Sequence, residues 1–530
     1  MKKIFFIFLA TLSVAKHSQA QITFQKAYGG TAYDVGYSAQ ETNDSGFIIT
    51  GGIRSFGAGN EDVYLIKISS DGTLQWTKTF GGTNNDDGYS IQQTNDEGFI
   101  IAGTTTSFGA GNNDFYLLKV ASDGTPQWTK TFGGAGDDFC SSVQKTNDGG
   151  FILIGTTKSF GLINEDIYII KTSSNGSLEW AKTFGGTYPD YGYSVSQTND
   201  GGFIASGETV SYGIGYGDAY LIKMTSDGNL QWSKTFGESS TNDLGNSIQQ
   251  TNDGGFIIGG TTSPPSSGNG DVYLIKTDSD GTLQWSKTFG GTKPDYGKSI
   301  LQANDGGFFI GGYTSSFGGG PHNFYLVKTI SDGTLSWSKT FGGSVDDEGF
   351  SFQKTNDGGL VITGWTNSFG VGSYDLYLIK TDSNGNSGCN ETNPNTITTT
   401  PTILTTNPAT QVSSGGIIGN LAAQTGSGGI ETTLCFTNGV NDFQNSKSEI
   451  NIFPNPFSTE ATIEVSSFKS QVPSSKLEFK LYDVFGREVR RLLFTDNRLL
   501  ITRGNLASGI YFYKFSDSTE VIGTGKIIIE

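Results

Sequence analysis

The chain has 530 residues, a formal net charge of −17 and 77 glycines, the last about twice the usual frequency of roughly 7%. Such an acidic chain lacks the basic surface that phosphates require, which argues against a nucleic-acid partner. The length has room for several domains, and 35% hydrophobic residues, with 12% aromatic ones, suffice for a sizeable core.

The N-terminus has the three parts of a secretory signal peptide. Lys2 and Lys3 supply positive charge, residues 4–14 are apolar, and Ala20 ends a small-residue cleavage site. The apolar stretch is too short to span a bilayer, which takes about 20 residues. We therefore assign residues 1–20 to a signal peptide and expect an exported mature chain without a transmembrane segment.

A unit of 52 or 53 residues then recurs seven times over residues 21–385, and its first copy begins part-way through the unit. Repetition at this period indicates a repeat architecture. The unit carries the motif Trp-Thr/Ser/Ala-Lys-Thr-Phe-Gly, of which residues 24–29 are a degenerate copy. The motif begins at Trp76, Trp128, Trp180, Trp232, Trp285 and Trp337.

Each unit predicts four antiparallel strands. In one unit, residues 87–94 form a first strand, and the continuous apolar run at 99–103 suits a strand covered on both faces. Residues 114–119 form a third strand, and the turn at Asp123 leads to residues 127–132, which alternate like a half-exposed outer strand. Four strands in roughly 50 residues is the size of a β-propeller blade.

The two ends of the repeat region complement each other. The mature chain starts with an isolated fourth strand at residues 22–28, and the seventh unit stops after its third strand at residues 375–380. We predict that the N-terminal strand completes the last blade and closes a seven-bladed β-propeller over residues 21–385. Closure removes the exposed sheet edges that invite aggregation.

Residues 386–447 break the repeat and are rich in Thr, Asn, Gly and Ser. Such a composition buries little apolar surface, so we interpret the segment as a linker. An exported chain can form disulfides. Cys389 and Cys435 bracket part of the linker and are the natural pair, whereas Cys140 replaces a glycine of the other units and is an isolated substitution.

Residues 448–530 contain short alternating strands separated by polar turns, which indicates a small β-sandwich. The motifs Pro-Asn-Pro at 454–456, Leu-Tyr-Asp-Val-Phe-Gly-Arg at 481–487 and Ser-Gly-Ile-Tyr-Phe-Tyr at 508–513 closely resemble the type A C-terminal sorting domain of the type IX secretion system of Bacteroidota. The resemblance implies the type IX machinery as a partner, then removal of the tail and attachment to the cell surface or release. The sorting residues that it marks are Pro454, Asn455, Pro456, Gly486, Gly509, Tyr511 and Lys526.

Little in the sequence indicates catalysis. Only two histidines occur, His17 in the signal peptide and His322 in a loop, which argues against a His-based triad or a zinc site with several His ligands. Carboxylates are abundant, so an acid pair of the glycosidase kind stays open.

An Asp recurs in the loop between the fourth strand of one unit and the first strand of the next. Seven carboxylates near one mouth of the channel would attract cations, and Ca²⁺ prefers oxygen ligands. The alternative is structural, because an Asp before a small residue often accepts backbone hydrogen bonds and fixes a turn. Recurrence in every unit favours the structural role, and no other cofactor is expected. The set is Asp34, Asp86, Asp138, Asp190, Asp243, Asp295 and Asp347.

The loops that differ between units should share one face of the propeller. We expect this face to recognise a binding partner. Exposed tyrosines with polar neighbours suit recognition of sugars or proteins. The candidate ligand-face aromatics are Tyr188, Tyr191, Tyr212, Tyr216 and Tyr296.

We therefore expect a secreted or cell-surface protein that binds an extracellular glycan or protein without catalysis, as an adhesion module would. The competing hypothesis is a secreted polysaccharide hydrolase that uses Asp pairs on the variable-loop face. A purely structural surface protein is the third alternative.

Overall fold

The computed structural model describes residues 21–264, 269–408, 411–413, 417–420, 424–426, 430–438, 450–453, 455–465, 477–483, 487–494, 498–516 and 521–529. The predicted signal peptide lies outside these residues. The chain separates into two compact units, Met1–Gly439 and Val440–Glu530.

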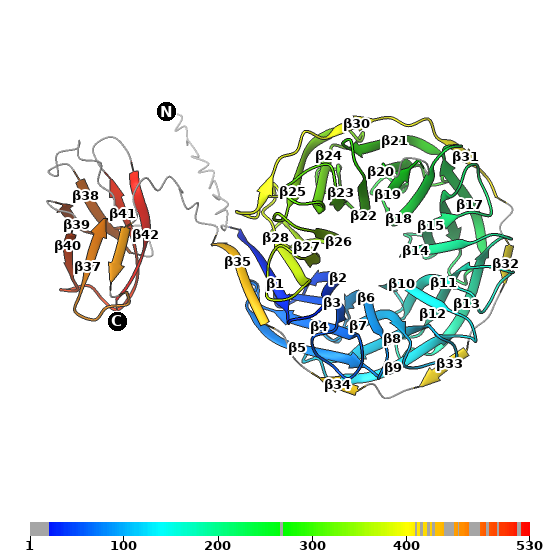
Figure 1. The fold of residues 1–530 in the computed structure, drawn as a ribbon, viewed down its shortest axis with the longest axis horizontal. Helices are drawn as coiled ribbons and strands as arrows, with labels where there is room; N and C mark the ends of the chain where they lie inside the picture. Colours follow the sequence, from blue (N-terminus) through cyan, green and yellow to red (C-terminus); the bar gives the residue numbers. More distant parts are fainter. Residues whose placement is uncertain are drawn as a thin grey trace, which may run out of the picture. The chain divides into compact units, whose positions relative to one another are not determined.

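In the described part of the first unit, seven antiparallel sheets stand around a common axis (Figure 1). Blades 1 to 6 each take four consecutive strands, and blade 7 takes three strands from the end of the repeats and one from the N-terminus. The middle strands are buried almost throughout, as their unbroken apolar runs predict. The predicted seven-bladed β-propeller is therefore present.

Four strand positions recur from the axis outward. The innermost strands are β2 (Asp34–Glu41), β6 (Asp86–Gln93), β10 (Asp138–Lys145), β14 (Asp190–Gln197), β18 (Asn242–Gln250), β22 (Asp295–Gln302) and β26 (Asp347–Lys354). The second strands are β3 (Phe47–Ile53), β7 (Phe99–Thr105), β11 (Phe151–Thr157), β15 (Phe203–Thr209), β19 (Phe256–Ser263), β23 (Phe308–Thr314) and β27 (Leu360–Thr366). The third strands are β4 (Asp62–Ile68), β8 (Asp114–Val120), β12 (Asp166–Thr172), β16 (Asp218–Met224), β20 (Asp271–Thr277), β24 (Asn323–Thr329) and β28 (Asp375–Lys380). The fourth strands are β5 (Leu74–Gly81), β9 (Pro126–Gly133), β13 (Leu178–Gly185), β17 (Leu230–Gly237), β21 (Leu283–Gly290), β25 (Leu335–Phe341) and, in blade 7, β1 (Ile22–Gly29).

The N-terminal strand β1 completes blade 7, as predicted. It pairs antiparallel with β28, from Phe24 opposite Lys380 to Tyr28 opposite Leu376. The side chain of Gln25 accepts a hydrogen bond from the Tyr377 hydroxyl, and Phe24 is fully buried. The first and last parts of the repeat region therefore share one sheet and one core.

The segment interpreted as a linker instead forms a fifth, outermost strand on every blade (Figure 1). We call residues 389–438 the belt. It passes blades 6 to 1 in descending order and ends on blade 7, against β1. Its strands, with the strand that each pairs with, are β29 (Glu391–Thr392) on β25, β30 (Ile397–Thr399) on β21, β31 (Leu404–Thr406) on β17, β32 (Gln411–Ser413) on β13, β33 (Ile417–Asn420) on β9, β34 (Gln424–Gly426) on β5 and β35 (Ile430–Asn438) on β1.

Threonine explains how so polar a segment stays on the ring. Three belt threonines place their hydroxyls against a threonine of a fourth strand, with Oγ1–Oγ1 distances of 2.7, 2.5 and 2.6 Å. Cross-strand Thr pairs stabilise a sheet without burying apolar area, and the blade edge supplies the backbone partners. The linker interpretation of residues 386–447 is thereby corrected for the seven described belt strands. The pairs are Thr235–Thr406, Thr288–Thr399 and Thr340–Thr392.

A disulfide joins the two ends of the belt. Cys389 precedes β29, and Cys435 lies in β35, with their Cα atoms 6.2 Å apart and 46 positions apart in sequence. Cys140 is a buried free thiol. The belt is thus tied to itself after one passage around all seven blades.

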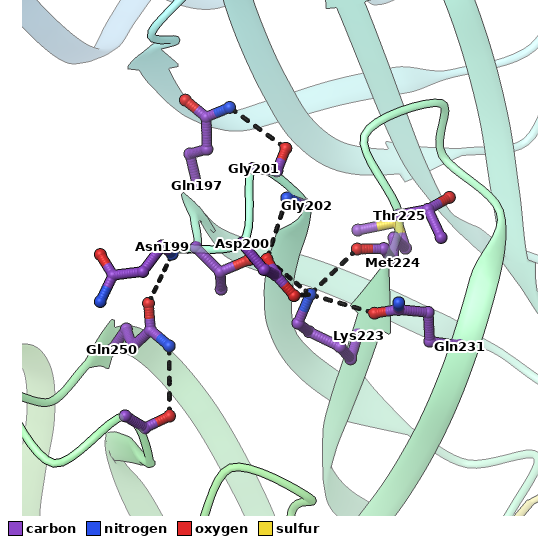
Figure 2. A network of polar contacts seen from close by, with 12 residues as sticks. Gln197, Asn199, Asp200, Gly201, Gly202, Lys223, Met224, Thr225, Gln231 and Gln250 are labelled. Carbon is purple, nitrogen blue, oxygen red and sulfur yellow. Dashed lines mark hydrogen bonds and ion pairs between the residues drawn. The ribbon is translucent and has the colours of Figure 1, made fainter.

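Every blade also has a buried lysine that fixes the turn between its first and second strands. In blade 4, Lys223 Nζ lies 2.9 Å from Asp200 Oδ2 and donates to the carbonyl of Met224 at 3.2 Å (Figure 2). The backbone N–H of Asn199 in the same turn donates to Gln250 Oε1 of blade 5 at 2.8 Å (Figure 2). This network holds each blade together and couples it to the next. The equivalent ion pairs are Lys67–Asp44, Lys119–Asp96, Lys171–Asp148, Lys276–Asp253, Lys328–Asp305 and Lys380–Asp357.

The second unit is a small β-sandwich, in agreement with the predicted fold. Side chains from both of its sheets share one core, in which Phe479 stacks on Tyr513 with ring centres 4.9 Å apart. One sheet has the order β36 (Ile450–Phe453), β37 (Glu460–Val465), β40 (Arg498–Thr502). The other has the order β39 (Glu488–Phe494), β38 (Leu477–Tyr482), β41 (Gly509–Ser516), β42 (Val521–Ile529).

Replacing both belt cysteines, Cys389→Ser with Cys435→Ser, should lower the free energy of unfolding by about 4 kcal/mol, because a loop closed over 46 residues no longer restricts the unfolded chain. Differential scanning calorimetry under non-reducing conditions measures the effect. As a control, Cys140→Gly restores the residue of the other units and leaves the belt tied, so it should cost only about 1 kcal/mol. A double variant that melts like the wild type would show that the belt does not depend on its disulfide.

Candidate functional site

A β-bulge recurs at the same place in every innermost strand. In β2 the pairing passes from Gly36 opposite Gly51 to Ser38 opposite Thr50, which leaves Tyr37 without a partner. Such a bulge re-aims the side chain of the extra residue. The same shift occurs in all seven described innermost strands. The bulged residues are Tyr37, Tyr89, Ser141, Tyr193, Asn246, Lys298 and Phe350.

All seven bulged residues line one cavity of about 400 Å³, which also touches Phe139 and Cys140. We call this cavity the axial pocket, because the innermost strands surround the axis (Figure 1). Each bulged residue is half-buried, while the residue before it is buried. The volume falls in the usual range of ligand pockets, roughly 300–1,000 Å³.

Aromatic rings form most of the pocket wall. The ring centre of Tyr37 lies 4.9 Å from that of Tyr89 and 5.5 Å from that of Phe350. The three rings form a continuous aromatic surface across blades 7, 1 and 2. On blade 4, the hydroxyl of Tyr193 donates to Glu208 Oε2 at 3.0 Å and so fixes its ring. Burial raises the pKa of the Tyr37 and Tyr193 phenols, so both stay neutral.

The polar side of the wall carries one positive charge. Asn246 Nδ2 donates to the carbonyl of Gly297 at 2.6 Å, which orients its amide. Lys298 Nζ stands 5.9 Å from the ring centre of Tyr313. Burial lowers the pKa of Lys298, and the carboxylate of Glu348 acts in the opposite direction.

A pair of carboxyl groups lies beside Tyr89. Burial, and then the charge of Glu61, raises the pKa of Asp87 to about 8. Arg54 Nη2 donates to Glu61 Oε2 at 2.8 Å. The hydroxyl of Tyr89 lies 3.4 Å from Asp87 Oδ2. Asp87 is therefore a protonated acid near neutral pH, next to the aromatic wall.

The seven recurrent Asp residues lie beneath their loops, with side chains at most 1% exposed. In blade 4, Asp190 Oδ2 accepts hydrogen bonds from the backbone N–H of Gly186 at 2.8 Å and from Ser211 Oγ at 2.7 Å. These contacts fix the turn between two blades. Among the described residues, no group of three or more His, Cys, Asp or Glu is arranged to hold a metal ion.

A second Asp lies at the start of the third strand. Its carboxyl group leaves no space for a side chain on the glycine that ends the repeat motif. A Cβ on Gly237 would lie 1.9 Å from Asp218 Oδ1 and 2.9 Å from Asp243 Oδ2. Burial raises the pKa of Asp218 to about 7, and the charge of Asp243 adds to the rise. In the described part of the chain, Asp218 Oδ1 has no hydrogen-bond partner. Two buried carboxyls thus share this place, and blade 6 has Asn323 there instead.

Four of the five candidate aromatics lie on or beside blade 4, and the fifth lies on blade 6. Tyr188 and Tyr216 are 60% and 65% exposed on the loops around blade 4. Tyr212 occupies a Phe position of the repeat, and its hydroxyl donates to the carbonyl of Gly185 at 2.5 Å. Tyr191 is half-buried on the same blade. Tyr296 lies on blade 6, where its ring centre is 4.6 Å from that of Tyr313.

Several sorting residues tie the β-sandwich together. Asn455 Nδ2 donates to the carbonyl of Lys526 at 3.1 Å, and the N–H of Ile528 donates to Asn455 Oδ1 at 2.8 Å. The bond from Asn455 to Pro456 is cis. Tyr511 Oη donates to the carbonyl of Ala507 at 2.9 Å, close to Gly509, which has a positive φ of 153°. Pro454 and Gly486 lie outside the described residues.

Two family models match the chain. The model described as "Secretion system C-terminal sorting domain" matches residues 451–530. The model described as "Domain of unknown function (DUF5122) beta-propeller" matches residues 100–126. No curated protein matches the chain.

Among solved structures, PorZ, a bacterial surface component of the type IX secretion system of Porphyromonas gingivalis, is 11% identical, with a TM-score of 0.38. The match covers 94% of this chain, which spans 59% of PorZ. A protein of unknown function from Bacteroides thetaiotaomicron is 13% identical over 66% of this chain and 100% of its own, with a TM-score of 0.30. The extracellular domain of a putative hybrid two-component system from B. thetaiotaomicron is 10% identical over 93% and 72%, with a TM-score of 0.23. Likenesses at these TM-scores support no inference about function.

The protein is a repeat β-propeller that ends in a type IX secretion sorting domain and is secreted or held at the outer cell surface. In the described ranges, no helix is long and apolar enough to cross a membrane. The sorting domain implies the type IX secretion machinery as a partner. The axial pocket is the cavity on which the seven bulged residues converge.

Asp218→Asn should stabilise the propeller at alkaline pH. Burial raises the Asp218 pKa from 3.8 to about 7, so its contribution to stability is full below the unfolded pKa and is lost as pH rises through about 7. Asn does not ionise, so the variant does not lose stability as the pH rises. We expect its melting temperature to be about 2 °C above that of the wild type near pH 8 and little different near pH 4.

Scanning calorimetry across this pH range makes the measurement. Asp123→Asn is the matched control, because Asp123 is exposed and the next unit already has Asn175 at this position. An equal gain for Asp218→Asn at both pH values, or none at the higher one, would contradict the carboxyl pair.

Proposed function

We propose that the propeller is a non-enzymatic binding module that holds a sugar unit of an extracellular glycan in its axial pocket. One observation carries the proposal: seven strands of nearly identical pattern turn side chains of five different types into the same cavity. Constant positions in a repeat maintain the frame, whereas positions that differ and also converge are suited to a ligand without sevenfold symmetry.

The composition of the wall supports a sugar. Flat faces such as those of Tyr37, Tyr89 and Phe350 offer apolar area to the C–H face of a pyranose, and tyrosine hydroxyls offer a polar edge to its hydroxyls. Few polar groups on a mostly aromatic wall are typical of pockets that fix the orientation of a small ligand. A cavity of about 400 Å³ suits one sugar unit better than the broad surface of a protein.

The carboxyl groups fit hydrolysis less well. Glycosidases hold two carboxyls about 5–10 Å apart, on either side of the scissile bond. Asp190 and Asp295 are buried and accept hydrogen bonds within their own loops. Glu61 and Asp87 are in direct contact, which leaves no room for a glycosidic bond between them.

Glycan-array screening followed by calorimetry on the mature chain tests the proposal. Tyr37→Ala should weaken binding of the best glycan about 30-fold, because it removes a central ring of the aromatic wall. Tyr188→Ala, on an exposed loop, should change the affinity less than about twofold. The melting temperature of each variant checks the fold.

Loss of affinity with Tyr188→Ala and not with Tyr37→Ala would move the site to the loops. Turnover of the bound glycan, abolished by Asp87→Asn, would favour the hydrolase. Absence of any bound glycan would contradict the proposal.

A further inference from the structure

We infer that the axial pocket selects a sugar that bears a carboxylate, with Lys298 as its counter-ion. This inference rests on the proposed function and adds the chemical class of the ligand. Lys298 is the one cationic side chain among the described residues that line the pocket. The other polar groups on the wall are the neutral side chains of Ser141 and Asn246 and the tyrosine hydroxyls.

Lys298 differs from the buried lysines of the frame. In each blade, a lysine of the third strand forms an ion pair with the carboxylate of a nearby turn, as Lys223 does with Asp200 at 2.9 Å. Lys298 forms no hydrogen bond and no ion pair with any described residue, although it is half-buried. A half-buried ammonium group without a hydrogen-bond acceptor is costly unless a ligand or water supplies one.

The acidic group whose charge acts on Lys298, Glu348, also has a second neighbour. Glu348, on β26, faces Lys298 and lies 3.3 Å from His322 Nδ1 through its Oε1. His322 Nδ1 also lies 3.2 Å from Asp346 Oδ1. Tyr313, from β23, presents only its ring to the ammonium group. Lys298 thus has a carboxylate nearby but no hydrogen-bond acceptor among the described residues, and a ligand in the pocket would supply one.

A carboxylate on a pyranose meets both halves of the site. The ring of the sugar packs against Tyr37, Tyr89 and Phe350, and its carboxylate accepts a charge-assisted hydrogen bond from Lys298, which is stronger than a neutral one. A neutral sugar of the same shape fills the aromatic part and leaves Lys298 desolvated. The acid should therefore bind about 10- to 100-fold more tightly than its neutral counterpart.

Uronic acid oligomers and their methyl esters are matched probes, because esterification removes the charge and keeps the ring. Calorimetry on the mature chain would compare galacturonate, glucuronate and mannuronate oligomers with their esters. We expect at least one acid to bind 10-fold or more tightly than its ester. Lys298→Met should abolish that preference without weakening the ester, and Lys298→Arg should retain it. Unchanged melting temperatures would confirm that both variants fold.

The outcomes separate this inference from the function on which it rests. Equal binding of acid and ester, or a preference that persists in Lys298→Met, overturns the role of Lys298. Neutral glycans that bind in a Tyr37-dependent manner, with no acidic glycan bound, overturn the carboxylate class and leave the proposed function in place. If no glycan binds, both fail.

Discussion

The pairing of β1 with β28 is the interaction on which the rest of the molecule depends. It brings the first strand of the mature chain into the last blade, so that seven sheets share an axis and no blade is left incomplete. The belt strand β35 covers the other edge of β1, and the disulfide ties the belt to its own start. Each innermost strand is thereby held at the axis, where its bulge can contribute to one pocket.

Frame and site occupy different positions of the same repeat. Buried carboxylates under the loops, the glycine beside them and the lysine–aspartate pairs recur in nearly every unit, because each satisfies a local demand of the blade. The side chain at the bulged position does not have to fix a turn or hold a blade together. The position carries Tyr, Phe, Ser, Asn or Lys, and these differences make the pocket asymmetric, with an aromatic side and a single cation.

The strands, the blade count and the closing strand could be predicted, since the repeat period and the incomplete ends leave few arrangements. The belt could not be predicted, because a Thr-rich segment buries little apolar area and therefore resembles a linker. Threonine pairs such as Thr235–Thr406 need only an available blade edge. The pocket was missed because strict alternation along a strand does not reveal a bulge. Its signal was present: Tyr37 and its equivalents vary between a nearly constant glycine and a constant serine.

Removal of β1 tests the central claim most directly. A mature chain that lacks residues 22–29 should melt at a much lower temperature than the full chain, because blade 7 and the final belt strand both lose their shared partner. Glycan binding in the axial pocket should be lost with it. A truncated chain with the melting temperature of the full chain would contradict the account of a ring closed by its first strand.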